Sequence, residues 1–142
     1  MNRFASLGVC ALILCALPLI LGCGTSELPK RKVYPTRGTL RMNGEPVRFA
    51  AVFLTPKDPT KGADADGDTD ENGVFTLRTY SNGDPDGAVP GTYSVIINGY
   101  NPTGKPPMPE GVTPTKLPKI PLELEATVEV TADDNDLVID IP

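Results

Sequence analysis

The sequence predicts an all-β protein, an antiparallel β-sandwich of about seven strands, and three observations support this fold class. Apolar residues alternate with polar ones at a period of two along a series of short segments. Turn-forming pairs such as Asn-Gly and Pro-Gly separate these segments. Sixteen prolines and fourteen glycines are scattered over the chain, which argues against long helices. The length of 142 residues predicts a single compact domain.

The alternation predicts which side chains face the core. In residues 50–56, Ala50, Val52 and Leu54 share one face of a strand that ends at Pro56. A first short strand is expected near Val33 to Leu40. The remaining expected strands and their inward residues are Leu40 and Met42 in 38–47, Phe75 and Leu77 in 68–80 (a hairpin turning at Asn72-Gly73), Tyr93, Val95 and Ile97 in 89–98, Val128 and Val130 in 126–130, and Leu137, Ile139 and Ile141 in 137–141.

Residues 99–119 break this pattern because their prolines exclude a central strand. We expect a long surface loop there, and loops of this length often carry function.

The amino terminus has the pattern of an export signal. Arg3 supplies one positive charge, and residues 4–21 then contain no charged side chain. A transmembrane helix is the alternative, since the apolar run nearly reaches the length needed to span a bilayer. Pro18 interrupts the run near its end, and a strongly basic flank is missing. We therefore interpret residues 1–22 as a signal peptide.

The end of the apolar run resembles the bacterial lipobox, in Ile20-Leu21-Gly22-Cys23. In proteins with this motif, the cysteine thiol receives diacylglycerol, a peptidase cuts before the cysteine, and the new amino group is usually acylated. The resemblance implies signal cleavage between Gly22 and Cys23 and lipidation of Cys23. Leu21 is a less usual residue at its position in the motif.

A free thiol or a disulfide is the alternative role for Cys23. The possible partners, Cys10 and Cys15, lie within the apolar run and would leave with it. An exported chain with one unpaired cysteine is unusual unless that cysteine is modified. Two or three acyl chains, at about 0.8 kcal/mol per buried methylene, would hold the protein to a membrane almost permanently.

Residues 23–32 are polar and proline-bearing and predict a lipidated, flexible tether, so the folded domain is expected over 33–142. Gly24 replaces the aspartate that signals retention at the inner membrane in well-studied bacteria. The resulting expectation is a lipid-anchored protein of the cell envelope, on the outer membrane and facing the periplasm or the cell surface.

Several stretches together resemble the carboxypeptidase regulatory-like, transthyretin-like domains. They are "GTLRMNGEPVRFAAVFLTP", "TDENGVFTL", "DGAVPGTYSVII" and "TVEVTADDNDLVIDI", within residues 33–142. The chain looks in particular like the small exported lipoproteins of planctomycete bacteria. The resemblance implies a seven-stranded prealbumin-like (immunoglobulin-like) sandwich, and it offers no catalytic residues to transfer. The family's "P-x-x-Y" element is replaced here by "LPKIPLELEA".

Composition excludes several function classes. The formal net charge of −5 gives no electrostatic basis for binding nucleic acid. Histidine is absent, so the commonest general base and the commonest neutral metal ligand are both missing. Tryptophan is also absent, which weakens the case for an aromatic platform that binds sugars. No enzymatic activity, catalytic residue, cofactor or metal ion is therefore expected.

The acidic stretch Asp64–Asn72 is a candidate calcium site. Asp68, Asp70, Asn72 and Gly73 match positions 1, 3, 5 and 6 of a calcium-binding loop. Position 12 is Thr79, where a bidentate glutamate would be needed. A solvated hairpin explains the same residues, because an Asn-Gly turn is sufficient reason for them.

Three apolar side chains are expected to point away from the core, at Phe53, Ile96 and Val138. They could form an outer patch that binds a partner. Serines such as Ser94 lack a histidine to activate them, and the carboxylates of the strands read as solvated faces. We expect a non-catalytic structural or protein-interaction module whose partner is an envelope protein or polymer; the alternative is a small-ligand module that binds calcium or a carbohydrate.

Overall fold

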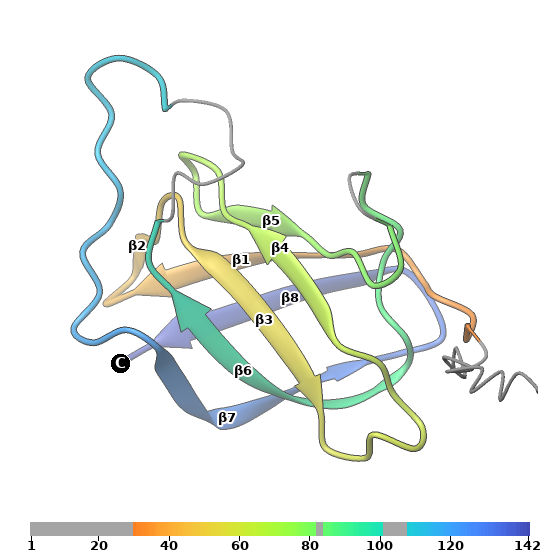
Figure 1. The fold of residues 1–142 in the computed structure, drawn as a ribbon. Helices are drawn as coiled ribbons and strands as arrows, with labels where there is room; N and C mark the ends of the chain where they lie inside the picture. The colour runs from red at the N-terminus through yellow and green to blue at the C-terminus, as the bar shows by residue number, and fades with distance from the viewer. Residues whose placement is uncertain (1–29, 82–83, 101–107) are drawn as a thin grey trace, which may run out of the picture.

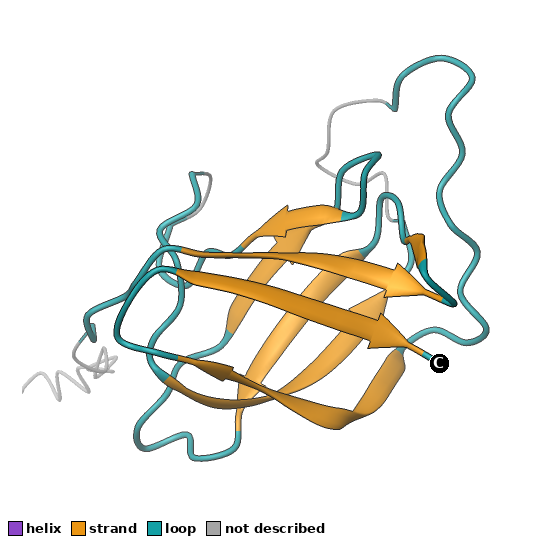
Figure 2. Ribbon diagram, turned by 180° about the vertical axis from the view of Figure 1, so that it is seen from behind, coloured by secondary structure: helices purple, strands orange, loops and turns teal. Residues whose placement is uncertain are grey.

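The computed structural model describes residues 30–81, 84–100 and 108–142. Two four-stranded sheets pack face to face (Figures 1 and 2), and the described residues include no helix. This arrangement confirms the predicted all-β class and is consistent with a β-sandwich. The strands are β1 Thr36–Met42, β2 Glu45–Pro46, β3 Ala51–Pro56, β4 Ala65–Asp68, β5 Val74–Thr76, β6 Gly91–Asn98, β7 Leu122–Val130 and β8 Asn135–Ile141.

One sheet has the order β4-β3-β6-β7 and is antiparallel throughout. Its register places Phe53 of β3 between Asp66 of β4 and Ile96 of β6. The register between β6 and β7 shifts between Ser94 and Ile96. Because side chains directly opposite one another share a face, this register decides which residues meet on the outside of the sheet.

The second sheet differs from the expected antiparallel pairing. β1 lies at its centre and pairs antiparallel with β2 and β5, but β8 runs parallel to β1 along all seven of its residues. The turn after β7 leads the chain from one sheet to the other, and β8 then runs beside β1 in the same direction. Local alternation predicted β1 and β8 but carries no information on this long-range pairing.

The predicted hairpin over 68–80 turns at Asn72-Gly73 as expected, with Gly73 at a φ of 75°. Its two arms nevertheless enter different sheets, since β4 pairs with β3 and β5 pairs with β1. Asp66 and Arg78 still exchange two backbone hydrogen bonds of 2.9 and 2.8 Å. This bridge joins the two sheets along one side of the sandwich.

The described residues form eight strands, one more than predicted. The expected strand 33–40 and the first part of the expected segment 38–47 form a single strand, β1, whereas β2 and β4 were not foreseen as separate strands. β4 lies in the acidic stretch, whose Asp and Gly residues have low β propensity. β7 begins at Leu122, four residues before the predicted 126, so the "LPKIPLELEA" segment contributes to the sheet.

The core confirms the predicted inward rows. Tyr93 is fully buried, and so are Phe75, Leu40 and Leu54. Met42, Val128 and Leu137 are only partly buried and pack against the edge of the core. The buried apolar cluster comprises Leu40, Val47, Ala50, Val52, Leu54, Ala65, Phe75, Leu77, Ala88, Tyr93, Val95, Ile97, Leu117, Val130, Ile139 and Ile141.

The described part of the predicted loop, 108–119, holds no strand, as expected. Thr115 fastens it to Arg48: the Thr115 hydroxyl accepts the Arg48 N–H at 2.9 Å, and the Thr115 N–H donates to the Arg48 carbonyl at 3.1 Å. Leu117 is buried in the core. Figure 1 shows this loop at the opposite end of the sandwich from residues 30–35.

Candidate functional site

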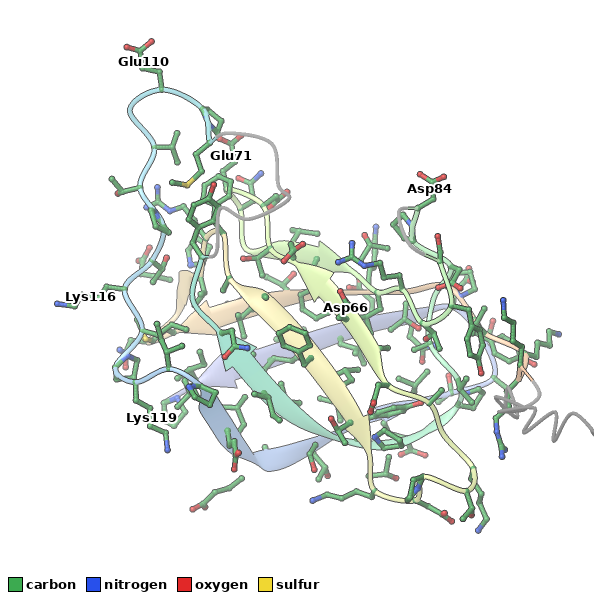
Figure 3. All side chains as sticks on the ribbon, viewed as in Figure 1. Asp66, Glu71, Asp84, Glu110, Lys116 and Lys119 are labelled. Atoms are coloured by element: carbon green, nitrogen blue, oxygen red, sulfur yellow. The ribbon has the colours of Figure 1, made fainter. Side chains whose placement is uncertain are left out.

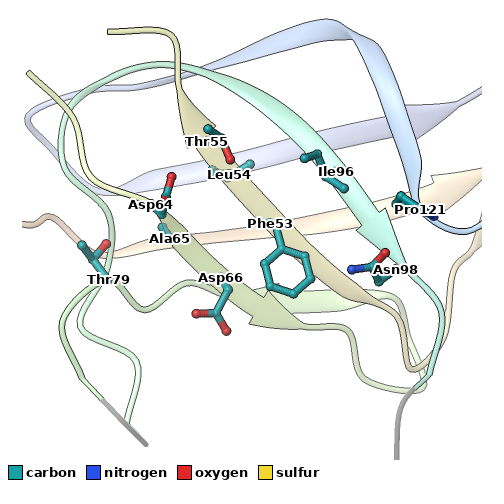
Figure 4. A pocket seen from close by; sticks show the side chains of 10 residues that line it. All are labelled: Phe53, Leu54, Thr55, Asp64, Ala65, Asp66, Thr79, Ile96, Asn98 and Pro121. Carbon is teal, nitrogen blue, oxygen red and sulfur yellow. The ribbon is translucent and has the colours of Figure 1, made fainter. Parts of the chain in front are cut away.

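An open cleft of about 600 Å³ lies on the outer face of the β4-β3-β6-β7 sheet (Figure 4). Phe53 stands in its middle. The walls come from three neighbouring strands and two flanking segments, and the lining residues are Phe53, Leu54, Thr55, Asp64, Ala65, Asp66, Thr79, Ile96, Asn98 and Pro121.

Strand alternation places Phe53 on this face. Val52 and Leu54 on either side of it are buried, so the ring between them points outward and is 37% exposed. The cross-strand register sets Ile96 directly beside the ring, and Glu123 of β7 continues the same row. The result is a small apolar centre of Phe53 and Ile96, with the exposed Pro121 at its border.

Polar side chains surround this apolar centre. In Figure 4 the Phe53 ring lies between the Asp66 carboxylate and the Asn98 amide. A row of hydroxyl groups flanks it on the other side, since Thr55 of β3 is in register with Ser94 of β6. The face therefore presents carboxylate, amide and hydroxyl groups around one exposed aromatic ring.

An arginine fixes the carboxylate beside the ring. The Arg78 guanidinium lies 2.5 Å from the Asp66 carboxylate and 3.8 Å from the Asp68 carboxylate, and all three side chains are partly buried. Charge-assisted hydrogen bonds of this kind are short and strong. Asp66, labelled in Figure 3, is thus held in place next to the cleft.

The candidate calcium ligands do not form a metal-binding group. Within the described residues no set of three or more carboxylate, cysteine or histidine side chains could hold a metal ion. The Asp70 carboxylate accepts the N–H groups of Asn72 and Val74 at 2.8 and 2.9 Å, so it caps its own turn. Asp68 sits on β4 beside Arg78.

The predicted outer patch is divided between two surfaces. Phe53 and Ile96 are neighbours on one sheet, but Val138, which is 57% exposed, lies on β8 of the other sheet. The alternation correctly predicted that the three side chains point outward. It could not say which strands share a sheet.

Ser94 and two of the glutamates of β7, Glu123 and Glu129, lie apart, whereas Glu125 is two residues from Glu123 on the exposed side of the strand. Ser94 faces Thr55 across the ladder, and Glu123 and Glu129 stand opposite Ile96 and Thr92. Six residues of extended strand separate these two glutamates, which is about 20 Å. That separation is far beyond the spacing of a glycosidase pair, at most about 9.5 Å.

Sequence reasoning missed the Arg78–Asp66 pair. The two residues are twelve positions apart on arms that enter different sheets, and only the bridge between the arms brings them together. Opposite charges flanking a predicted hairpin turn were the signal that could have found the pair.

The final residues of the predicted tether contact the folded domain. The Lys30 ammonium lies 5.8 Å from the centre of the Tyr80 ring, and the Lys32 ammonium 4.7 Å from that of Tyr34. The Arg31 guanidinium donates to the Thr60 carbonyl. Gly22 and Cys23, the predicted cleavage and lipidation residues, lie outside the described residues.

Comparisons with protein families, curated proteins and solved structures give no match for this chain. The likeness to carboxypeptidase regulatory-like domains stays a prediction. In the described ranges, the structure has no helix that is long and apolar enough to cross a bilayer.

Proposed function

We propose that this protein is a lipid-anchored, non-catalytic module of the cell envelope that docks a partner through the outer face of its β4-β3-β6-β7 sheet. The observation that carries the proposal is the cleft around Phe53, where a partly exposed ring and its neighbour Ile96 stand in a polar face. Exposed apolar centres with a polar rim mark interaction sites. The partner is an envelope protein or an envelope polymer.

The anchor is supported by the sequence. Cys23 follows an uncharged apolar run, and after cleavage before it the chain would contain no second cysteine. Gly22 gives the small residue that the cleavage site needs. The lipid would hold the domain at a membrane surface. Because Gly24 and not an aspartate follows the cysteine, we place that surface at the outer membrane.

The lack of catalytic arrangements supports a binding role. The chain has no histidine, and Arg78 engages the Asp66 carboxylate in the cleft and the neighbouring Asp68 carboxylate. The same cleft also supports the alternative of a small-ligand module, because the polar groups of the cleft suit a carbohydrate. The calcium version has less support, since the Asp70 carboxylate is used within its own turn.

Metabolic labelling with an alkyne analogue of palmitate tests the anchor. We expect the full chain to incorporate the label in a bacterial host and to lose residues 1–22, as read by mass spectrometry. The Cys23→Ser variant should take up no label, while Cys15→Ser serves as the matched control and should be labelled like the wild type. An intact leader or an unmodified thiol in the wild-type protein would refute the anchor.

A further inference from the structure

We propose that the cleft around Phe53 binds a neutral saccharide unit of an envelope polymer, with the sugar ring stacked on Phe53 between Asp66 and Asn98. This inference rests on the proposed docking face and names the chemistry of its partner. The observations that carry it are the placement of the ring, the polar groups on both sides of it, and the charge of the face.

The ring is built as a platform. Phe53 has buried neighbours before and after it in the strand, so its backbone is fixed while its ring stands exposed. Pyranose rings have an apolar face of C–H groups that packs against aromatic carbons. Phenylalanine has no polar atom of its own to satisfy, so the ring can be covered by such a face without losing a hydrogen bond.

The flanking groups match sugar hydroxyls. A hydroxyl both donates and accepts, and the Asn98 amide offers a donor and an acceptor on one side of the ring. On the other side the Asp66 carboxylate, held by Arg78 at 2.5 Å, supplies a fixed acceptor. Thr55 adds a further hydroxyl to the wall of the cleft.

Size favours a saccharide over a protein surface. The cavity of about 600 Å³ lies within the range of small-ligand pockets, roughly 300–1,000 Å³. A stable protein interface needs about 800 Å² from each partner and an apolar centre of several residues. Of the apolar residues that line the cleft, Leu54 and Ala65 are buried, so the accessible apolar centre consists of Phe53, Ile96 and Pro121.

Charge favours a neutral saccharide over an anionic one. Asp64 and Asp66 line the cleft, Asp68 and Glu123 extend the same rows, and Arg78 is already paired with two of these carboxylates. The whole chain carries a net charge of −5. An acidic polymer would be repelled by this face.

Calorimetric titration of the purified full chain with cellohexaose, chitohexaose and mannohexaose tests the inference. We expect at least one of these neutral hexasaccharides to bind. Phe53→Ala should weaken binding about tenfold, the effect of losing roughly 1.4 kcal/mol of stacking. Phe53→Tyr keeps the ring and should bind within about threefold of the wild type. Val138→Ala, an exposed apolar residue on the other sheet, is the matched control and should bind unchanged.

Failure of all three sugars to bind, or binding that Phe53→Ala leaves intact, would overturn the inference. Asn98→Ala leaves the ring in place and should also weaken binding. It serves as the test if the Phe53→Ala variant does not fold. The lipid label distinguishes the two proposals. Sugar binding without a lipid on Cys23 would refute only the anchor, whereas a labelled protein that binds none of the sugars would refute only the saccharide.

Discussion

Tyr93 is the largest fully buried side chain, and it carries a polar hydroxyl group. Its side chain is fully buried, and its hydroxyl donates to the Val89 carbonyl at 2.5 Å, four residues earlier in the chain. Tyr93→Phe keeps the ring and leaves that carbonyl without its hydroxyl donor. We expect a loss of about 1–2 kcal/mol in the free energy of unfolding, measured by urea denaturation. Tyr34→Phe, at a half-buried ring, is the control and should change stability by less than about 0.5 kcal/mol.

The same hydroxyl predicts a dependence of stability on alkaline pH. Burial raises the pKa of Tyr93 above its usual 10.0. The unfolded chain therefore loses this proton first, so the stabilising contribution is complete below about pH 10 and falls as the pH rises through the folded-state pKa. We expect the stability difference between wild type and Tyr93→Phe to stay constant up to about pH 9 and to shrink as the pH rises above about 10. A constant difference would show that the hydroxyl is not protected from ionisation.

Asp70 is the residue that distinguishes a hydrogen-bonded turn from a calcium site. Because its carboxylate already accepts two backbone N–H groups, we expect the melting temperature to be the same in millimolar calcium and in chelator. Asp70→Ala should lower the free energy of unfolding by about 1 kcal/mol in both conditions, read by thermal denaturation. A melting temperature that rises with calcium in the wild type but not in this variant would restore the calcium hypothesis.

For single residues, the sequence predicted the face to which a side chain points better than it predicted which other residues lie near it. The alternation in β3 was sufficient to place Phe53 on the outside, because a period of two is a local property. The proposed role of Phe53 in stacking on a sugar was not predicted, because the absence of tryptophan weakened the case for an aromatic platform. The neighbour Asn98 could not be found, because it depends on which strands adjoin. The Arg78–Asp66 pair left only a weak signal, the opposite charges on the two sides of the predicted turn.

At the scale of elements, β1 holds the second sheet together at a glycine. Gly38 pairs with Phe75 on one side and with Leu137 on the other. A Cβ at this position would lie 2.5 Å from Cζ of Phe75 and 2.7 Å from the Leu137 carbonyl oxygen. The backbone oxygen belongs to the paired strand and cannot rotate away, so an added methyl group must separate β1 from β8.

Gly38→Ala should therefore cost at least about 2 kcal/mol in the free energy of unfolding. Thr39→Ala, one residue along the same strand, is the control and should cost less than about 1 kcal/mol. Urea denaturation with matched transitions by circular dichroism measures both. Equal stability of the two variants would mean that β1 and β8 do not approach as closely as the register requires.

The pairing of β1 with β8 also marks the limit of local prediction. Both strands were expected from their alternation, yet their parallel direction is set by a turn at Thr131 to Asp134 that crosses between the sheets. Asn135 organises this turn: its side-chain oxygen accepts from Thr131 and its amide donates to the Thr131 and Asp133 carbonyls. The sequence "ADDND" predicts a turn, but the same residues would serve a simple hairpin.

At the scale of the whole molecule, the two ends of the sandwich differ. Residues 30–32 enter at one end, where the Arg31 guanidinium contacts Thr60 in the β3–β4 connection. The loop 108–121, with Lys116 and Lys119, lies at the other end (Figures 1 and 3). If a lipid is attached to Cys23, only six residues lie between it and Lys30. The seven steps from one to the other span at most about 25 Å.

This short connection predicts how the domain stands on a membrane. Lys61 lies in the β3–β4 connection with Thr60 and so belongs to the tether end. Lys116 lies at the other end of the sandwich, which is separated from the tether end by the length of a strand, about 27 Å for the eight residues of β6. Single cysteines introduced as Lys61→Cys and Lys116→Cys in the acylated protein can carry a fluorescent donor on vesicles with an acceptor in the headgroups. We expect stronger energy transfer from position 61, because the lipid holds that end near the surface while the outer sheet and the loop extend away from it. Equal transfer from both positions would show that the domain tumbles freely on its tether, and stronger transfer from position 116 would contradict the proposed attachment.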